Sequence, residues 1–322
     1  MTTARAVSVI PVPPSTVTSS FGSGKRESHD ASGFYRRFPP PALSKDEHVA
    51  SPVLVNQLFC SDARHMSDVQ VADSSVALVV TSPPYFAGKE YESELGQGFV
   101  PGSYLEYLEM LRTVLEVCLA KLEPGGRMAI NVANLGRRPY RSLSADVIGI
   151  LQDDLGMLLR GEIIWVKARG AGGSCAWGSF RSPANPVLRD VSERVILASK
   201  GRFDRAVPRA ERIRRDLPHV STLTTEGFLE ATLDVWEIPS ESASRIGHPA
   251  PFPLALPRRL IVLYTYQSDL VLDPFIGSGT TAVAAVESGR HYVGFDIDPG
   301  YLEIAERRLL KTRDQRSETR HL

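Results

Sequence analysis

Residues 270–285, LVLDPFIGSGTTAVAA, combine a short apolar strand, an acidic residue, a glycine turn and small residues typical of a helix. In α/β proteins, ligands bind beyond the carboxyl ends of parallel strands, and glycines let the backbone approach the ligand closely. We therefore expect Gly277, Gly279 and the following Thr280 to line a nucleotide-like site. The GxG pattern alone is a weak signal, because no third glycine completes a dinucleotide fingerprint.

Two carboxylates beside this turn narrow the choice of ligand. Asp296 lies 19 positions after Gly277, near the end of the apolar segment 291–297, where it can accept hydrogen bonds from both hydroxyls of a ribose. Asp273 argues against a phosphate ligand, because its charge would repel pyrophosphate and attract an ammonium or sulfonium group. These residues predict S-adenosylmethionine as the ligand. The alternative is a structural turn followed by an aspartate at the end of a strand.

Apolar periodicity places this turn in an α/β protein. Strands are predicted at residues 54–59, 76–80, 127–132, 161–167, 193–200, 270–272 and 291–297. Helices are predicted at residues 103–122, 144–154 and 254–265, after 279 and from 299 onward, with a short helical hint at 225–229. We expect Pro124-Gly125-Gly126 to end the first helix and Ser144 to cap the second. Strands that alternate with helices favour a mostly parallel sheet covered on both faces.

A second motif, TSPPYF at residues 81–86, directly follows the predicted strand 76–80. SPPY together with DPFxGSGT resembles the amino-methylating DNA methyltransferases, which methylate the exocyclic nitrogen of cytosine or adenine. The order of the motifs, with SPPY first, a variable region next and the glycine turn last, resembles the permuted β class of these enzymes. The resemblance covers roughly residues 50–312. It implies a Rossmann-like S-adenosylmethionine-dependent methyltransferase sheet with a circularly permuted motif order and an inserted target-recognition region.

The chemistry of this reaction accounts for the predicted catalytic residues Ser82, Pro83, Pro84 and Tyr85. An exocyclic amine is a poor nucleophile, because its lone pair is delocalised into the ring. Hydrogen bonds from its two protons to Ser82 Oγ and the Pro83 carbonyl would aim that lone pair at the methyl carbon. The prolines stiffen the turn, and Tyr85 offers a stacking face to a base extruded from the duplex. The alternative for the tetrapeptide is a rigid exit from a strand.

The resemblance also implies cofactor contacts outside the glycine turn, each with a structural alternative. Asp62 would contact the adenine amine of the cofactor, or it would cap a helix. Phe275 would wall the cofactor site or belong to the core. The methionine end would be shaped by His248, Pro249 and Pro253, which are equally compatible with a purely structural role. Trp165 lies where the family has an aromatic behind the flipped base, but a core tryptophan is the alternative.

Local charge predicts where DNA would bind. Residues 160–215 contain 13 Lys and Arg against 5 Asp and Glu, although the whole chain is neutral. Such an excess suits contacts with the phosphates of double-stranded DNA, and a solvated basic face is the alternative. Within the glycine-rich insert we predict DNA contacts from Arg169, Trp177, Arg181 and Arg189, because arginine can bind guanine edges with two hydrogen bonds.

The sequence also suggests how the chain is divided. We expect a disordered tail (1–32), a catalytic half (33–166), a target-recognition region with one core strand (167–247, strand 193–200), a cofactor-binding half (248–312) and a flexible tail (313–322). The three cysteines, Cys60, Cys118 and Cys175, have no CxxC spacing, so we expect reduced thiols, mostly in the core, and no metal site.

Three functions remain open at this stage. Serine at the first position of SPPY resembles the cytosine-N4 enzymes, whereas aspartate is usual for adenine-N6 enzymes, so the leading hypothesis is a site-specific cytosine-N4 methyltransferase. It would be a solitary enzyme or would be paired with a restriction endonuclease that acts separately. An adenine-N6 enzyme is the alternative, and a non-catalytic nucleic-acid-binding protein is the second alternative. No apolar stretch reaches the roughly 18 residues that span a membrane, so we expect a cytoplasmic, nucleoid-associated protein, and the oligomeric state stays open.

Overall fold

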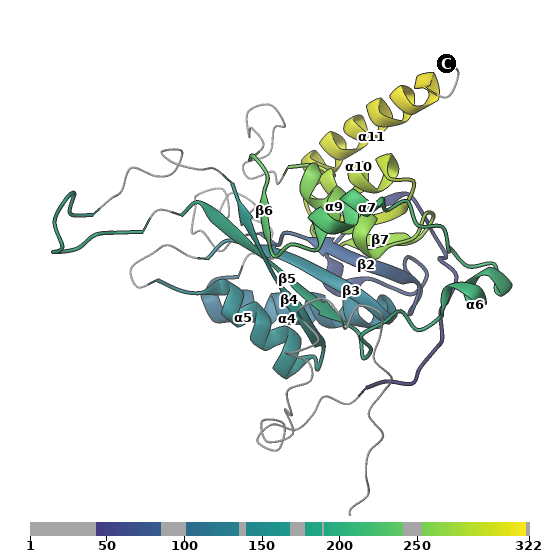
Figure 1. Ribbon diagram of the computed structural model, residues 1–322, viewed down its shortest axis with the longest axis horizontal. Helices are drawn as coiled ribbons and strands as arrows, with labels where there is room; N and C mark the ends of the chain where they lie inside the picture. The colour runs from purple at the N-terminus through teal and green to yellow at the C-terminus, as the bar shows by residue number, and fades with distance from the viewer. Residues whose placement is uncertain are drawn as a thin grey trace, which may run out of the picture. The chain divides into compact units, whose positions relative to one another are not determined.

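The computed structural model describes residues 43–84, 101–134, 140–167, 178–188, 190–240 and 253–319, which build an eight-stranded sheet with helices on both faces (Figure 1). The strand order is β1-β8-β7-β2-β3-β5-β4-β6. The strands are β1 (Gln57–Cys60), β2 (Val76–Thr81), β3 (Leu122–Val132), β4 (Leu158–Val166), β5 (Ser192–Ser199), β6 (Val235–Glu237), β7 (Leu270–Asp273) and β8 (His291–Asp296).

The helices fall between these strands. They are α4 (Tyr104–Lys121), α5 (Leu143–Gly149), α6 (Arg209–Arg214), α7 (Thr225–Ala231), α9 (Ala255–Tyr264), α10 (Thr280–Glu287) and α11 (Pro299–Thr319), with a short 3-10 helix (Ala63–His65) and a π-helical turn (Ile150–Asp154). None of the helices in the described ranges is long and apolar enough to cross a membrane.

Strand direction confirms the predicted mostly parallel sheet. Among the strands of this sheet, β5 runs antiparallel to its neighbours, β3 and β4, whereas the other adjacent pairs are all parallel. The carboxyl ends of the other seven strands therefore meet at one edge of the sheet, which we call the carboxyl edge. Their amino ends meet at the opposite edge, the amino edge.

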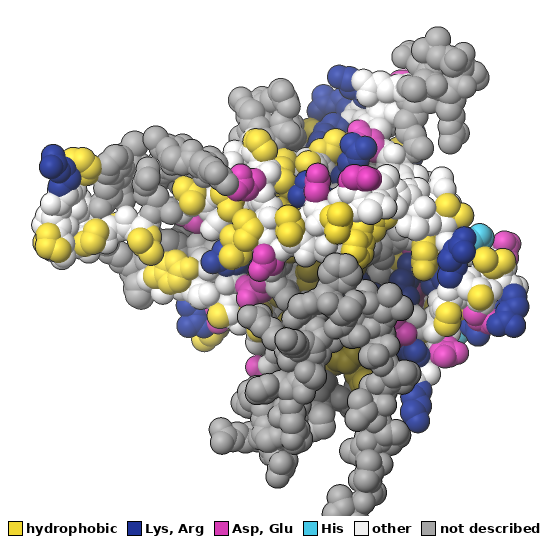
Figure 2. Space-filling view, in the orientation of Figure 1, with side chains coloured by type: hydrophobic (Ala, Val, Ile, Leu, Met, Phe, Trp, Pro, Cys, Tyr) yellow, Lys and Arg dark blue, Asp and Glu magenta, His cyan; other side chains and the backbone are white. Residues whose placement is uncertain are grey.

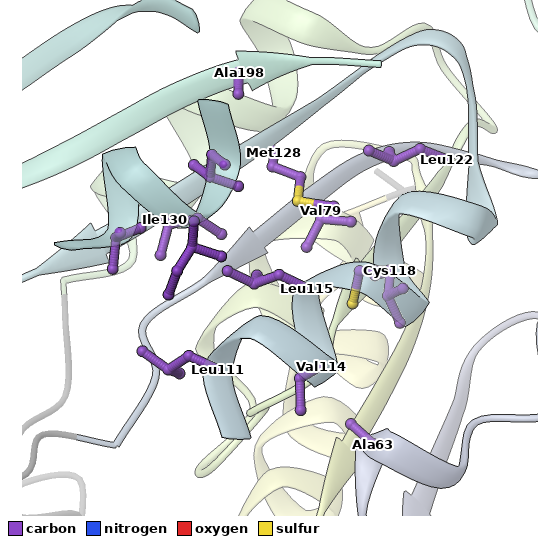
Figure 3. Close-up of a cluster of buried hydrophobic side chains, with 14 of the residues drawn as sticks. Ala63, Val79, Leu111, Val114, Leu115, Cys118, Leu122, Met128, Ile130 and Ala198 are labelled. Carbon is purple, nitrogen blue, oxygen red and sulfur yellow. The ribbon is translucent and has the colours of Figure 1, made fainter. Parts of the chain in front are cut away.

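Residues 78–80 of the central strand β2 alternate between two helical layers, whereas Val76, before the register shift between β2 and β3, lies on the same side as Val79. Val76 and Val79 pack in a cluster with side chains of α4 and α5, while Leu78 and Val80 pack in a second cluster with α9 and α10. Figure 3 shows Val79 in the first cluster, between strand residues and the side chain of Leu115 on α4. A core on each face explains why the strand is apolar at every position before Thr81, as is typical of buried parallel strands.

Two predicted boundaries are wrong. Pro124-Gly125-Gly126 does not end a helix: α4 stops at Lys121, β3 begins at the next residue, and the three residues lie inside this strand. The pairing of β3 with β2 shifts register there, which accommodates the proline. Helix α5 is capped by Ser142, whose Oγ accepts a hydrogen bond from the Ala145 N–H, and not by Ser144.

Other differences concern region 167–247 and the residues that follow 312. Region 167–247 contributes two strands to the sheet, β5 and the unpredicted β6, where one was expected. Helix α6 was also missed, and α11 continues to Thr319, past residue 312, where we expected a flexible tail. Cys118 is buried as predicted, but Cys60 is exposed, because it ends an edge strand; Cys175 lies outside the described residues.

Candidate active site

Both sequence motifs lie at the carboxyl edge, because β2 and β7 are neighbours in the sheet. The chain leaves β2 through Ser82-Pro83-Pro84, which we call the catalytic loop. It leaves β7 after Asp273 through the glycine turn 274–279, which we call the cofactor loop. Asp296 ends β8, the next strand after β7. The topology thus brings together segments from opposite ends of the chain.

The backbone of the cofactor loop requires glycine. Gly277 and Gly279 have φ values of 48° and 81°, in the left-handed region that side chains disfavour. A Cβ on Gly279 would also lie 2.6 Å from the Cβ of Ala305 on α11, so α11 packs directly beneath the turn. Helix α10 begins at Thr280, and no side chain of the described residues caps it, so its first backbone N–H groups can bind a polar group of a ligand.

Asp296 holds the other side of this loop. Its Oδ2 accepts a hydrogen bond from the Gly277 N–H at 2.9 Å, and its Oδ1 accepts one from the Asp298 N–H at 2.9 Å. Burial raises the pKa of this carboxyl, while the backbone N–H groups lower it in part. A carboxylate has about four acceptor positions, so Asp296 can also accept the two hydroxyls of a ribose. The geometry fits the nucleoside end of S-adenosylmethionine.

Asp273 is engaged inside the protein. Its side chain is 1 % exposed; Oδ1 accepts hydrogen bonds from Thr81 Oγ1 at 2.6 Å and the Phe275 N–H at 3.0 Å, and Oδ2 accepts one from Thr281 Oγ1 at 2.6 Å. Burial raises the pKa of Asp273 to about 6, although these donors oppose the effect. The carboxylate that we expected to face a cationic ligand therefore binds three groups of its own chain.

A polar network lies behind Ser82. Asn131, near the end of β3 and 2 % exposed, donates from Nδ2 to Glu193 Oε2 at 2.6 Å and to Ser82 Oγ at 3.4 Å. Lys167 Nζ donates to Glu193 Oε1 at 3.1 Å. Asn131 Oδ1 is buried and has no hydrogen-bond partner among the described residues. A buried carboxylate must face a donor, so Glu193 fixes which end of the Asn131 amide points toward Ser82.

The cofactor loop receives further support from α11. Nη1 of Arg308 donates to the Ser278 carbonyl at 2.7 Å, to Ser278 Oγ at 3.1 Å and to Thr280 Oγ1 at 3.0 Å. These bonds satisfy polar groups on both sides of Gly279. Together with the packing of Ala305, they hold the turn against the last helix.

Four residues were predicted either to contact the cofactor or the base or to have a structural role, and the structure shows their surroundings. The carboxylate of Asp62 caps the 3-10 helix through the Arg64 N–H and pairs with the Arg64 guanidinium; burial would raise its pKa, but Arg64 lowers it overall. Trp165 is 2 % exposed, and its Nε1 donates to the Ile238 carbonyl, so it is a core tryptophan. Phe275 is partly buried against the hydrophobic cluster that contains Val79 and the side chains of α4. Pro253 is buried just before α9.

Several predicted site residues fall outside the described ranges. They are Tyr85, Arg169, Trp177, Arg189, His248 and Pro249. Arg181 is described; it is exposed, has a φ of 55° and lies in the segment 178–188, which Gly178 and Pro186 close with a β-bridge.

The described residues of the basic stretch 160–215 do not form a single surface, which corrects our expectation. Arg205 and Arg212 are buried in ion pairs with Glu123 and Asp269, at the starts of β3 and β7. This is the amino edge of the sheet, where the Lys and Arg side chains over α6 also gather (Figure 2). Lys167 and Arg194, in contrast, lie near the carboxyl edge. The excess charge is divided between opposite ends of the sheet.

Five polar residues that organise this edge were not predicted from the sequence. They are Thr81, Asn131, Glu193, Thr281 and Arg308. One signal was available, because Asn131 interrupts the apolar run of strand 127–132. The others become visible only through the pairing of distant segments. Within the described ranges, no group of three His, Cys, Asp or Glu side chains could hold a metal ion.

Comparison with known proteins identifies the family. Residues 76–307 match the family model of the N6 and N4 DNA methylases, which covers more than half of the chain. The chain belongs to this family. Among curated relatives, the Type II methyltransferase M.MjaI of Methanocaldococcus jannaschii is 28 % identical over 287 residues, covering 79 % of this chain and 91 % of the relative. The Type II methyltransferase M.Cfr9I of Citrobacter freundii is 27 % identical, covering 81 % and 91 %.

Solved structures agree with the fold. TTHA0409 of Thermus thermophilus, solved with S-adenosyl-L-methionine, is 28 % identical with a TM-score of 0.59, covering 80 % of this chain and 93 % of that one. The cytosine-N4-specific PvuII DNA methyltransferase is 20 % identical with a TM-score of 0.58, covering 80 % of this chain and 88 % of that one. At this identity the similarity supports the fold and not the activity. The family and fold confirm the predicted Rossmann-like sheet and S-adenosylmethionine as the cofactor of a DNA methyltransferase.

Proposed function

We propose that this DNA methyltransferase transfers the methyl group of S-adenosylmethionine to the exocyclic N4 of cytosine at a specific site in duplex DNA. The observation that carries the proposal is Ser82, a neutral acceptor at the carboxyl edge beside the cofactor loop. A hydroxyl oxygen with a fixed neighbour can accept one amine proton, and the carbonyl of Pro83 can accept the other.

In this mechanism the residues of the chain position the base and the cofactor and make the amine nitrogen a better nucleophile. The target base leaves the duplex at a cost of a few kcal/mol, part of which stacking on Tyr85 would offset. Hydrogen bonds to the two amine protons reduce delocalisation of the nitrogen lone pair and direct it at the methyl carbon, which the cofactor supplies when bound. Asp296 would hold the ribose of the cofactor, and Gly277 and Gly279 would let the backbone of the loop come close to the cofactor. Phe275 and Asp62 would contact its adenine end.

We also infer a permuted β-class organisation with a target-recognition region at 167–247, from which Arg169, Trp177, Arg181 and Arg189 would contact DNA. The Type II names of the relatives support a role in restriction–modification, with a cognate endonuclease that acts separately. The two halves, 33–166 and 248–312, would supply the catalytic and cofactor loops.

The test is chemical identification of the product. The protein is incubated with duplex DNA of mixed sequence and S-adenosylmethionine, the DNA is digested, and methylated nucleosides are identified by mass spectrometry. N4-methylcytosine is the expected product, while N6-methyladenine would replace the proposed base and keep the mechanism.

Ser82→Ala should lower turnover by about 10-fold to 100-fold and keep cofactor affinity, whereas Asp296→Ala should weaken cofactor binding. Equal loss of cofactor affinity in both variants would contradict this division of roles.

A further inference from the structure

A buried group of three hydrogen-bonded side chains, one from the TSPPYF motif and two from the segment 270–285, connects the catalytic loop to the cofactor loop. Thr81 is the last residue of β2 and precedes Ser82, whereas Thr281 lies in the first turn of α10, two residues after Gly279. The side chain of Asp273, at the end of β7, lies between them. Each of the three residues is 1 % exposed.

The bonding pattern identifies the donors. An ionised carboxylate only accepts hydrogen bonds, so both threonine hydroxyls must donate to Asp273. Thr81 donates to Oδ1 and Thr281 to Oδ2, each at 2.6 Å, a length typical of charge-assisted O–H···O bonds. Oδ1 also accepts the Phe275 N–H at 3.0 Å, which draws the first residues of the cofactor loop onto the same carboxylate.

Backbone pairing alone does not fix the two loops relative to each other. The recorded register between β2 and β7 pairs Leu78 with Val271 and Val79 with Leu272, so it ends before either loop begins. The Thr81 to Asp273 bond extends this connection past the last paired residues. It lies one residue before the serine that would bind the base.

We propose that Thr81 is a positioning residue which, through the Asp273 carboxylate that it shares with Thr281, holds the catalytic loop at a fixed distance from the cofactor loop. The inference rests on the proposed roles of Ser82 and of the glycine turn. Transfer of a methyl group requires nitrogen and carbon to meet in line at about 3 to 3.5 Å, and a displacement of about 1 Å can cost about 100-fold in rate. The two threonines therefore have different expected effects.

The first experiment compares hydroxyl deletions of nearly equal volume. In Thr81→Val, Asp273 keeps its bonds to Thr281 and Phe275, so the cofactor loop should stay formed. The single-turnover rate of methyl transfer to duplex DNA should fall about 10-fold to 100-fold, with the Kd for S-adenosylmethionine within about 2-fold. Thr81→Ser, which keeps the donor, should restore most of the rate. Thr281→Val should instead raise the Kd for S-adenosylmethionine.

A matched control shows whether any lost threonine hydroxyl has these effects. Thr113→Val removes a hydroxyl whose acceptor among the described residues is the Glu109 carbonyl of its own helix, so rate and Kd should both stay at the wild-type values. An unchanged rate in Thr81→Val would overturn the positioning role. So would an equal loss of rate and cofactor affinity in that variant, because Thr81 would then be part of the cofactor site or of the general fold.

A second measurement does not depend on turnover. In the wild-type protein, S-adenosylmethionine should slow hydrogen–deuterium exchange in the cofactor-loop peptide and in the peptide that carries Ser82, the one residue of the catalytic loop with a backbone N–H. In Thr81→Val it should slow exchange only in the cofactor-loop peptide. Protection of both loops in the variant would overturn the proposed connection. Absence of methyl transfer by the wild-type protein, with coupled protection intact, would count against the proposed function and leave the connection between the loops supported.

Discussion

At the scale of single residues, the carboxyl edge consists of buried polar side chains that hold the loops rather than face the solvent. Asp273 and Asn131 are each at most 2 % exposed, yet each contacts a residue next to or within the catalytic loop. Removing one partner from such a group leaves another polar atom buried without a hydrogen bond, which costs about 1 to 3 kcal/mol. Substitutions here should therefore affect both stability and turnover.

Asn131→Ala should lower both the stability of the protein and its turnover. The variant removes the donor that Ser82 Oγ and Glu193 Oε2 share, so each of these oxygens loses one hydrogen bond. We expect the free energy of unfolding to fall by about 1 to 3 kcal/mol, measured by urea denaturation, and turnover to fall at temperatures where the variant is folded. Asn134→Ala is the control, because among the described residues its Oδ1 accepts the Ser144 N–H and does not contact Ser82 or Glu193. A stable Asn131 variant with wild-type turnover would exclude this network from the site.

Asp273 should make stability depend on pH. Burial raises its pKa to about 6 in the native protein, above the value of about 3.9 in an unfolded chain. The native state therefore binds more protons between these values, so the stability from this group is greatest below pH about 4 and is lost as the pH rises through about 6. Asp273→Asn should flatten this decline in urea unfolding measured from pH 4 to 7. Parallel profiles of the two proteins would contradict the raised pKa.

At the scale of helices and strands, α11 acts as a support for the cofactor loop. Arg308 binds the loop on both sides of Gly279, and Ala305 packs against Gly279 itself. The helix thus limits how far the turn can move away from β8. It contributes to the cofactor site from a segment that carries no recognisable motif.

Arg308→Met should weaken S-adenosylmethionine binding by about 10-fold, because hydrogen bonds from a charged donor contribute about 1.5 to 3 kcal/mol. Isothermal titration calorimetry would measure the Kd. Arg307→Met is the matched control, since this neighbouring guanidinium is exposed and, within the part of the chain that the structure describes, donates to the Glu303 carbonyl of its own helix and not to the cofactor loop. Equal affinities in the two variants would show that α11 does not hold the loop.

Sequence patterns predicted some elements better than others for physical reasons. β2, β7 and β8 are buried on both faces, so they appear as continuous apolar runs, and the glycine turn is marked by residues that its backbone requires. β6 is three residues long with two exposed residues, too short for any periodic signal. The reversed direction of β5 was also unpredictable, because side-chain alternation is the same in parallel and antiparallel strands.

The same limit applies to the candidate site. Ser82, Asp273 and Asp296 could be predicted because they lie within or beside motifs. Thr81 and Glu193 could not, because their partners Asp273 and Asn131 lie far away in the sequence and become neighbours only through the strand order. The basic stretch was misjudged for a related reason: composition does not indicate which arginines are paired and buried.

At the scale of the whole molecule, the residues proposed to bind the reactants lie at one edge of the sheet, and a cluster of buried ion pairs lies at the opposite edge. The carboxyl edge carries both loops, while a buried ionic cluster closes the amino edge. In this cluster Arg205 and Arg212 pair with Glu123 and Asp269, and both guanidinium groups lie about 5 Å from the ring of Tyr266. The cluster has two positive and two negative charges, so it is neutral as a unit. It ties the segment before α6 to the starts of β3 and β7.

Arg212→Met should therefore destabilise the protein without changing its site. The variant leaves two carboxylates buried beside a single arginine, and breaking such a pair costs about 3 to 5 kcal/mol. Arg214→Met is the matched control, because Arg214 is 75 % exposed and its pair with Glu211 lies at the surface, where ion pairs contribute about 1 kcal/mol or less. Urea denaturation should separate the two variants. The Kd for S-adenosylmethionine, measured where both are folded, should equal the wild-type value, since the cluster lies at the opposite end of the strands from both loops. Weakened cofactor binding in folded Arg212→Met would show that the two edges are coupled through the sheet.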